Sequence, residues 1–161
     1  WAITYGSGMR NDPRYTPSDV FETFPRPTTT AALVELGQVL HSERREIMTR
    51  RDLGLTKLYN LVNSPDVPSH SDPDVGRMRE IHVELDHAVI DAYGWGDIET
   101  HHGVHVFRKM QRWTVGSAAR IELLDRLLEE NHTRYSKEAN RSSLTSPGAA
   151  GDEVGNGVLF R

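Results

Sequence analysis

The chain of 161 residues is long enough for one domain, or for one domain with short flanking segments. Its net charge of -4 excludes a histone-like or otherwise strongly basic nucleic-acid binder, although it does not exclude a basic surface of limited extent. The absence of cysteine excludes disulfides, zinc ribbons and thiol chemistry, and because no apolar run approaches the roughly 18 residues that cross a bilayer, we expect a cytoplasmic protein.

Residues 1–27 combine an apolar beginning with a proline-rich connector. Trp1 and Ile3 stand at the very start, where most chain ends are polar and frayed, so we expect this chain to be a piece of a longer protein, with processing of the chain end as the alternative. Four prolines follow between residues 11 and 27. Because proline fixes φ and removes a backbone donor, they favour an ordered connector over a helix or a central strand.

Residues 28–140 contain four helical patterns. Apolar residues recur with the spacing of one helix face, and capping residues flank the patterns, which predicts helices at 28–51, 54–63, 74–93 and 117–139. Thr28 to Thr30 supply N-cap candidates for the first helix, Asp72 or Asp74 begins the third, and Gly94 ends it. We expect packing between these helices to bury the side chains of Leu33, Leu40, Leu58, Met78, Leu85, Ile121, Leu124 and Leu128.

Two short extended segments separate the third helix from the fourth. Residues 104–107 and 112–115 are rich in β-branched and aromatic side chains, which predicts a hairpin-like insert that turns near Lys109–Gln111. Residues 141–161 contain few large apolar side chains and are expected to form a disordered tail. The sequence therefore predicts a mainly α fold, a small domain of about four helices with a short β-hairpin-like insert.

Charge is distributed unevenly along the chain. Residues 52–100 carry ten acidic side chains against three basic ones, whereas no acidic residue occurs between Glu99 and Glu122. A basic segment with interleaved aromatic residues can contact a phosphate backbone, although such a segment can also be a simple solvated face. Together with two arginines near the start of the chain, this segment supplies candidate DNA-backbone contacts, namely Arg10, Arg14, Arg108, Lys109 and Arg112.

Five histidines are candidate metal ligands. His101, His102 and His105 form an H-H-x-x-H cluster, and His82 and His87 lie on the predicted third helix. Zinc needs three or four converging ligands, but residues five apart on a helix point about 140° away from each other. The cluster also lacks the helical glutamate of metalloproteases. The sequence favours structural or solvated histidines, with a metal site as the alternative.

Five segments carry a family resemblance when they are taken together in order: Trp1–Arg10, Arg14–Pro27, Met48–Asn60, Met78–Trp95 and Leu123–Tyr135. They resemble the end of the target-recognition region and the helical tail of type II restriction-modification DNA methyltransferases that act on adenine. The resemblance covers roughly residues 1–140, and it implies a parent enzyme that uses S-adenosylmethionine as methyl donor and is often fused to a nuclease.

The motifs of the catalytic domain do not occur in this sequence. The family's catalytic motif is Asn/Asp-Pro-Pro-Tyr/Phe, and the segment Asn11–Arg14 lacks the second proline and the aromatic residue. The glycine-rich cofactor motif is also missing, so we assign no catalytic, cofactor-binding or metal residue to this chain and expect it to be inactive alone. The resemblance implies a structural or DNA-backbone-positioning role, with DNA and upstream methyltransferase domains as partners. The alternative is a stand-alone helical protein-interaction module.

Overall fold

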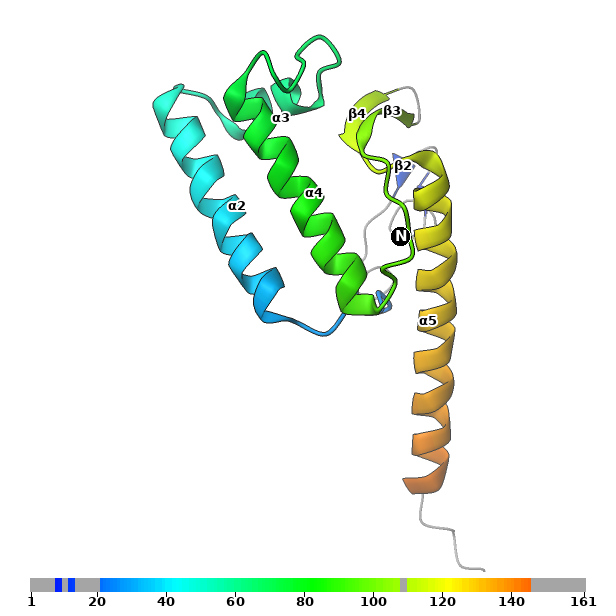
Figure 1. The fold of residues 1–161 in the computed structure, drawn as a ribbon. Coiled ribbons are helices and arrows are strands. Elements are labelled where there is room, and N and C mark those ends of the chain that lie inside the picture. The colour runs from blue at the N-terminus through cyan, green and yellow to red at the C-terminus, as the bar shows by residue number, and fades with distance from the viewer. Residues whose placement is uncertain (1–7, 10–11, 14–20, 108–109, 146–161) are drawn as a thin grey trace, which may run out of the picture.

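The computed structural model describes residues 8–9, 12–13, 21–107 and 110–145 of the chain (Figure 1). These residues form the helices α2 (Ala31–Arg50), α3 (Leu55–Asn63), α4 (Pro73–Tyr93) and α5 (Ser117–Thr145). They also form two antiparallel strand pairs, β1 (Gly8–Met9) with β2 (Asp12–Pro13) and β3 (Gly103–Phe107) with β4 (Met110–Thr114). The predicted mainly α fold with a hairpin-like insert is confirmed.

The helix ends follow local capping chemistry. The Oγ1 of Thr30 accepts a hydrogen bond from the amide of Leu33 at 3.2 Å, and Asp72 caps α4 in the same way. Gly94 ends α4 with a left-handed φ of 76°, as predicted. The reversal of the hairpin lies between the paired residues Phe107 and Met110, slightly earlier than predicted.

Helix α5 is longer than the sequence analysis predicted. It runs to Thr145 instead of ending near residue 139, so residues 141–145 of the predicted tail are helical. The reason is local, because neither proline nor glycine occurs in this segment until Pro147. The predicted tail from residue 146 onward lies outside the described residues. No helix within the described ranges is long and apolar enough to cross a bilayer.

The hydrophobic core lies where α3 meets the antiparallel pair of α2 and α4 (Figure 1). Ile47 from α2, Leu58 and Val62 from α3, and Met78 from α4 are buried together. Leu40, Met48 and Tyr59 pack against this cluster. Burial of these side chains away from water supplies the main favourable term for the fold.

The burial pattern corrects part of the predicted core. Leu58 and Met78 are fully buried, as expected. Ile121, in contrast, is 62% exposed, so the prediction that it belongs to the core is wrong. The other predicted core residues are only half-buried, namely Leu33, Leu40, Leu85, Leu124 and Leu128. For the residues of α5 the reason is that this helix stands beside the α2–α4 pair and packs less closely on the other elements than α2, α3 and α4 pack on one another (Figure 1).

The segment that leads into α2 is fastened at three of its carbonyl groups. The hydroxyl of Tyr93 donates to the carbonyl oxygen of Pro25 at 2.8 Å. Asn131 donates to the carbonyl oxygen of Thr23, and Arg134 donates to that of Arg26 at 2.7 Å. Side chains from α4 and α5 therefore hold the chain in place before α2 begins.

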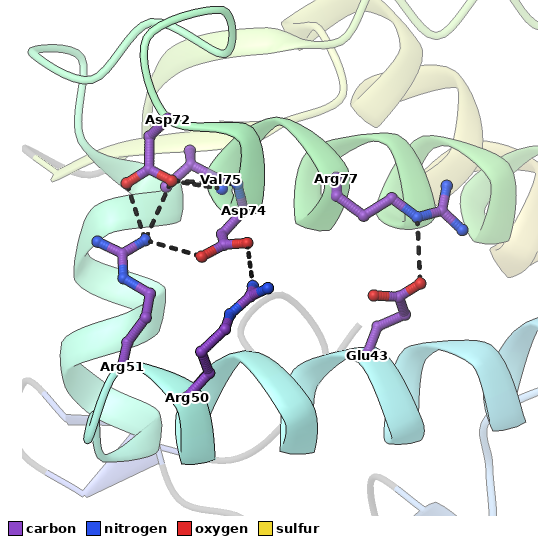
Figure 2. A network of polar contacts seen from close by, with 7 residues as sticks. All are labelled: Glu43, Arg50, Arg51, Asp72, Asp74, Val75 and Arg77. Carbon is purple, nitrogen blue, oxygen red and sulfur yellow. Dashed lines mark hydrogen bonds and ion pairs between the residues drawn. The ribbon is translucent and has the colours of Figure 1, made fainter.

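A polar network joins the end of α2 to the start of α4 (Figure 2). One Nη of Arg51 donates to both carboxylate oxygens of Asp72 at 2.8 and 3.0 Å. The same carboxylate caps α4 by accepting from the amides of Asp74 and Val75. Arg50 pairs with Asp74 in the same network. Burial alone would raise the pKa of Asp72, but these hydrogen bonds and the charge of Arg51 outweigh burial and lower it.

The network predicts a pH-dependent stability. Because the pKa of Asp72 is lower in the folded chain, its contribution is complete above about pH 4, the ordinary aspartate pKa, and is lost as the pH falls through the lowered value. Asp72→Asn keeps a capping side chain but removes the charge. We expect the variant to unfold with about 1 kcal/mol less free energy at pH 6, and we expect this difference to shrink at pH 3.

Urea denaturation at the two pH values measures the effect, and Asp66→Asn in the loop before α4 is the control. A difference between the wild type and Asp72→Asn that is the same at both pH values would contradict the role given to the Asp72 charge.

Candidate functional site

A pocket of about 450 Å³ lies where α3, α4, the β3–β4 hairpin and the start of α5 meet. Val62 and Trp113 contribute apolar wall to this pocket. Its lining also contains side chains that can form hydrogen bonds or carry charge, namely Tyr59, Asn63, His82, Asp86, His102, Arg112, Thr114 and Arg120. Such a wall, partly apolar with a few convergent polar groups, is typical of a binding site.

Hydrogen bonds from α3 fix the hairpin over this pocket. The Nδ2 of Asn63 donates to the carbonyl oxygen of Tyr59 at 2.8 Å, while its Oδ1 accepts from the backbone amide of Trp113 at 3.1 Å. The indole ring of Trp113 packs against the guanidinium of Arg79, whose central carbon lies 4.6 Å from the ring centroid. The side chain at the end of α3 therefore positions β4.

Tyr59 and His82 form one polar pair in the pocket wall. The Tyr59 hydroxyl and the His82 Nε2 are 3.1 Å apart, and the two rings meet edge to face. Burial lowers the pKa of His82, and the nearby charge of Asp86 offsets that only in part. His82 is consequently a neutral imidazole near pH 7, able to form hydrogen bonds without adding charge to the site.

A second pair joins His102 to Asp86. The His102 Nε2 lies 2.8 Å from an Asp86 carboxylate oxygen, and the His102 side chain is only 7% exposed. The His102 ring also packs edge to face against His87, whose Nε2 lies 3.0 Å from the Oγ1 of Thr100. Because Asp86 pairs with His102, one carboxylate of the acidic helix α4 lies against the residues that lead into the hairpin.

The histidines of the H-H-x-x-H cluster have separate partners. His101 lies 3.0 Å from a carboxylate oxygen of Glu99, and His105 lies 2.9 Å from the carbonyl oxygen of His101. His102 turns instead toward Asp86. Over the described ranges, no group of three histidine or carboxylate side chains is arranged to hold a metal ion.

Of the candidate DNA-contacting residues, the structure describes Arg112. This residue is exposed on β4, lines the pocket, and pairs across the ladder with His105. Arg120, from the same acid-free stretch, also lines the pocket, and its Nη2 donates to the carbonyl oxygen of Val115 at 3.2 Å. The other four candidates lie outside the described residues, namely Arg10, Arg14, Arg108 and Lys109.

Sequence reasoning found one side of this pocket and missed the other. The lack of acidic residues between Glu99 and Glu122 indicated the side that contains Arg112 and Trp113. No local pattern connects these two residues with the side formed by Tyr59, Asn63 and His82. Asn63 and Trp113, for example, are 50 residues apart in the chain and meet through a single hydrogen bond. A polar residue at the last position of a short helix is the only signal that the sequence offers for such a contact.

The arrangement suits an anion better than a cation. Two arginines line the pocket, its one carboxylate is engaged by His102, and His82 is neutral. A singly charged phosphodiester matches this balance, since arginine binds phosphate oxygens through several donors. Comparisons with protein-family models, curated proteins and solved structures find no match to the chain. The functional argument therefore starts from these side chains.

Proposed function

We propose that this chain positions DNA through contacts with the phosphate backbone, as the C-terminal helical domain of a cytoplasmic adenine-specific DNA methyltransferase. The S-adenosylmethionine-dependent catalytic domain would lie upstream, since its motifs are missing from this sequence. One observation carries the proposal, namely that Arg112 is exposed on a hairpin whose whole segment, from Thr100 to Ile121, contains no acidic residue. The family resemblance of five ordered segments adds to it.

The charge distribution indicates which surface faces DNA. The acidic residues of the segment 52–100 repel phosphates, whereas the hairpin offers arginine beside an aromatic wall, and Asp86, the acid that shares this pocket, is paired with His102. Contacts of this kind set the register and orientation of a protein on a duplex but do not read its sequence. We therefore assign base recognition to the upstream part of the parent enzyme and name no base-contacting residue here.

A DNA titration tests this proposal. With four to six cations in contact, we expect Kd values of about 10⁻⁴ to 10⁻⁶ M at physiological salt, and a slope of log K against log salt of about -0.9 per phosphate contact. Changing Arg108, Lys109 and Arg112 together to alanine is expected to weaken binding about tenfold or more and to flatten the slope by two to three contacts. Fluorescence anisotropy of a short labelled duplex at two salt concentrations measures both quantities.

The matched control removes the same charge elsewhere. Arg45, Lys57 and Lys137 are exposed on three different helices, and their joint change to alanine is expected to leave most of the binding intact. If both triple variants bind DNA equally well, or if the wild type binds tightly with little dependence on salt, the hairpin is a solvated face and the proposal fails.

The second candidate is a stand-alone helical protein-interaction module. It is favoured by the exposed apolar side chains of α5, among them Ile121 and Tyr135. The gene upstream of the Trp1 codon distinguishes the two candidates. A continuous reading frame that encodes the Asn/Asp-Pro-Pro-Tyr/Phe motif supports the methyltransferase domain, whereas a start codon close to Trp1 supports the module.

A further inference from the structure

One buried hydrogen-bond donor in the pocket wall lacks an acceptor. The indole Nε1 of Trp113 is the one buried side-chain nitrogen or oxygen in the described part of the chain that has no hydrogen-bond partner. Trp113 belongs to β4 and lines the pocket between α3, α4, the hairpin and the start of α5. An indole N–H donates but does not accept, and a buried donor without an acceptor is unfavourable. A ligand that brings an acceptor oxygen into the pocket would remove this cost.

Several acceptors of the pocket wall are already engaged. A carboxylate oxygen of Asp86 lies 2.8 Å from the Nε2 of His102, and the Tyr59 hydroxyl lies 3.1 Å from the Nε2 of His82. Two arginines line the same pocket. A ligand that carries negative charge and whose polar atoms are acceptors suits such a wall, and a phosphodiester has both properties.

Arg112 stands next to Trp113 at the edge of β4 that faces α3. The backbone amide of Trp113 donates to the Oδ1 of Asn63 on α3, so the pocket borders this edge of the strand. Successive side chains of a strand point to opposite faces, but beside an edge both can reach one pocket, and both residues line it. Arg112 is exposed, and its Nη2 lies 3.9 Å from the sulfur of Met110, a weak acceptor. A phosphate oxygen is a better partner for this guanidinium.

We propose that the pocket binds one phosphodiester group of the DNA backbone, with the indole N–H of Trp113 and the guanidinium of Arg112 as donors to its oxygens. The inference rests on the proposed function for the source of the phosphodiester, whereas the site itself can be tested without DNA. Because Nε1 is buried in the free chain, the ligand reaches it after a neighbouring side chain moves, and the exposed Arg112 has room to move. The indole is uncharged, so its contact adds affinity without adding to the salt dependence.

NMR spectroscopy of the full chain, labelled with ¹⁵N, tests the site directly. The chain contains three tryptophans, and Trp1→Phe and Trp95→Phe identify the indole N–H signal of Trp113 by elimination. We expect dimethyl phosphate, a single phosphodiester, to shift this signal in a saturable manner, whereas sodium chloride at the same ionic strength leaves it in place. The signal of Trp95, which stacks on Tyr93 and does not line this pocket, is the internal control. Absence of a saturable shift of the Trp113 signal overturns the proposal.

A titration with a short duplex separates this inference from the proposed function. Trp113→Phe keeps an aromatic ring and the net charge, so we expect it to weaken DNA binding about tenfold at an unchanged salt slope. Trp95→Phe is the matched control and should bind like the wild type, and thermal unfolding of both variants checks the fold. If Trp113→Phe does not fold, the shift of the Trp113 signal on addition of the duplex to the wild type decides instead.

The outcomes of the two experiments distinguish the two proposals. If Trp113→Phe folds and binds as tightly as the wild type, while the wild type shows the expected salt slope, the phosphate site is wrong and the proposed function stands. If dimethyl phosphate shifts the Trp113 signal but the duplex does not, the site takes a phosphate compound from another source, and its assignment to DNA is wrong.

Discussion

Arg79→Leu is expected to lower the free energy of unfolding by about 3 kcal/mol or more, the range reported when a buried hydrogen-bonded charge loses its network. Arg79 is only 3% exposed. Its guanidinium donates to the carbonyl oxygens of Val62, Ser64 and Val67 at 2.8–2.9 Å and to the Ser69 hydroxyl at 3.1 Å. Leucine would leave these acceptors without a donor. It would also remove the cation beneath the Trp113 ring.

The positive charge of Arg79 is stabilised by the dipoles of the backbone carbonyl groups that accept its hydrogen bonds. Burial lowers its pKa, yet a guanidinium stays protonated throughout the accessible pH range. Two of its acceptors, the carbonyls of Val62 and Ser64, lie at the end of α3, where a helix favours positive charge. Arg79→Lys is expected to recover little of the lost stability, because an ammonium group cannot reach acceptors that the planar guanidinium spans.

Urea denaturation followed by circular dichroism measures this loss, and Arg77 supplies the control two residues away on the same helix. Its guanidinium lies 3.5 Å from the carboxylate of Glu43 on α2 (Figure 2) and also within ion-pair distance of Glu80 and Glu84, all at partly exposed positions. Surface ion pairs of this kind contribute about 0–1 kcal/mol. Equal losses for Arg77→Leu and Arg79→Leu would show that the buried contacts carry no special weight.

Two glycines in helices are expected to respond to alanine with opposite signs. Gly76 is buried in the first turns of α4, and a Cβ added there would lie 2.7 Å from the backbone carbonyl oxygen of Ser69. Gly37 is exposed in α2, and a Cβ there would meet nothing within 4 Å. Alanine is normally the better helix residue by about 0.5–1 kcal/mol. We therefore expect Gly37→Ala to stabilise the fold by about that amount.

At Gly76 the same substitution has to displace backbone. The loop that carries Ser69 also supplies acceptors to Arg79, so it cannot retreat without disturbing those hydrogen bonds. We expect Gly76→Ala to cost about 1–3 kcal/mol in spite of the gain in helix propensity. The midpoints of thermal unfolding of the two variants and the wild type give the comparison. A rise in the midpoint for Gly76→Ala would mean that this loop yields easily.

Features that depend on neighbouring residues could be predicted from the sequence, whereas contacts between residues far apart in the sequence could not. Thr30 and Gly94 act through groups within a few residues, so the caps and the helix starts follow from short motifs. The period of α5 correctly indicated an amphipathic helix, but a period cannot tell whether another element of the chain covers the apolar side. Ile121 was therefore predicted as core and is exposed.

The buried polar contacts show the same limit. Arginine is usually a surface residue, so the sequence gives no sign that Arg79 is buried. It is buried because the end of α3 and the following loop pack over it and accept its hydrogen bonds. Asp86 is one of the ten acids of the segment 52–100, and nothing in the sequence indicates that it pairs with His102 from the hairpin. Each of these contacts joins residues that are ten or more positions apart, beyond the reach of periodicity.

The fastening of the segment before α2 has a mechanical consequence. Tension applied to the chain ahead of Thr23 would meet three side chains, Asn131, Tyr93 and Arg134, before it reached the first turn of α2. Those side chains come from α4 and α5, so the force would be divided between two long helices along their sides. A helix pulled from its end unzips one hydrogen bond at a time, whereas bonds arranged side by side must break together. These three hydrogen bonds would therefore keep tension in the segment before α2 from unwinding the helices.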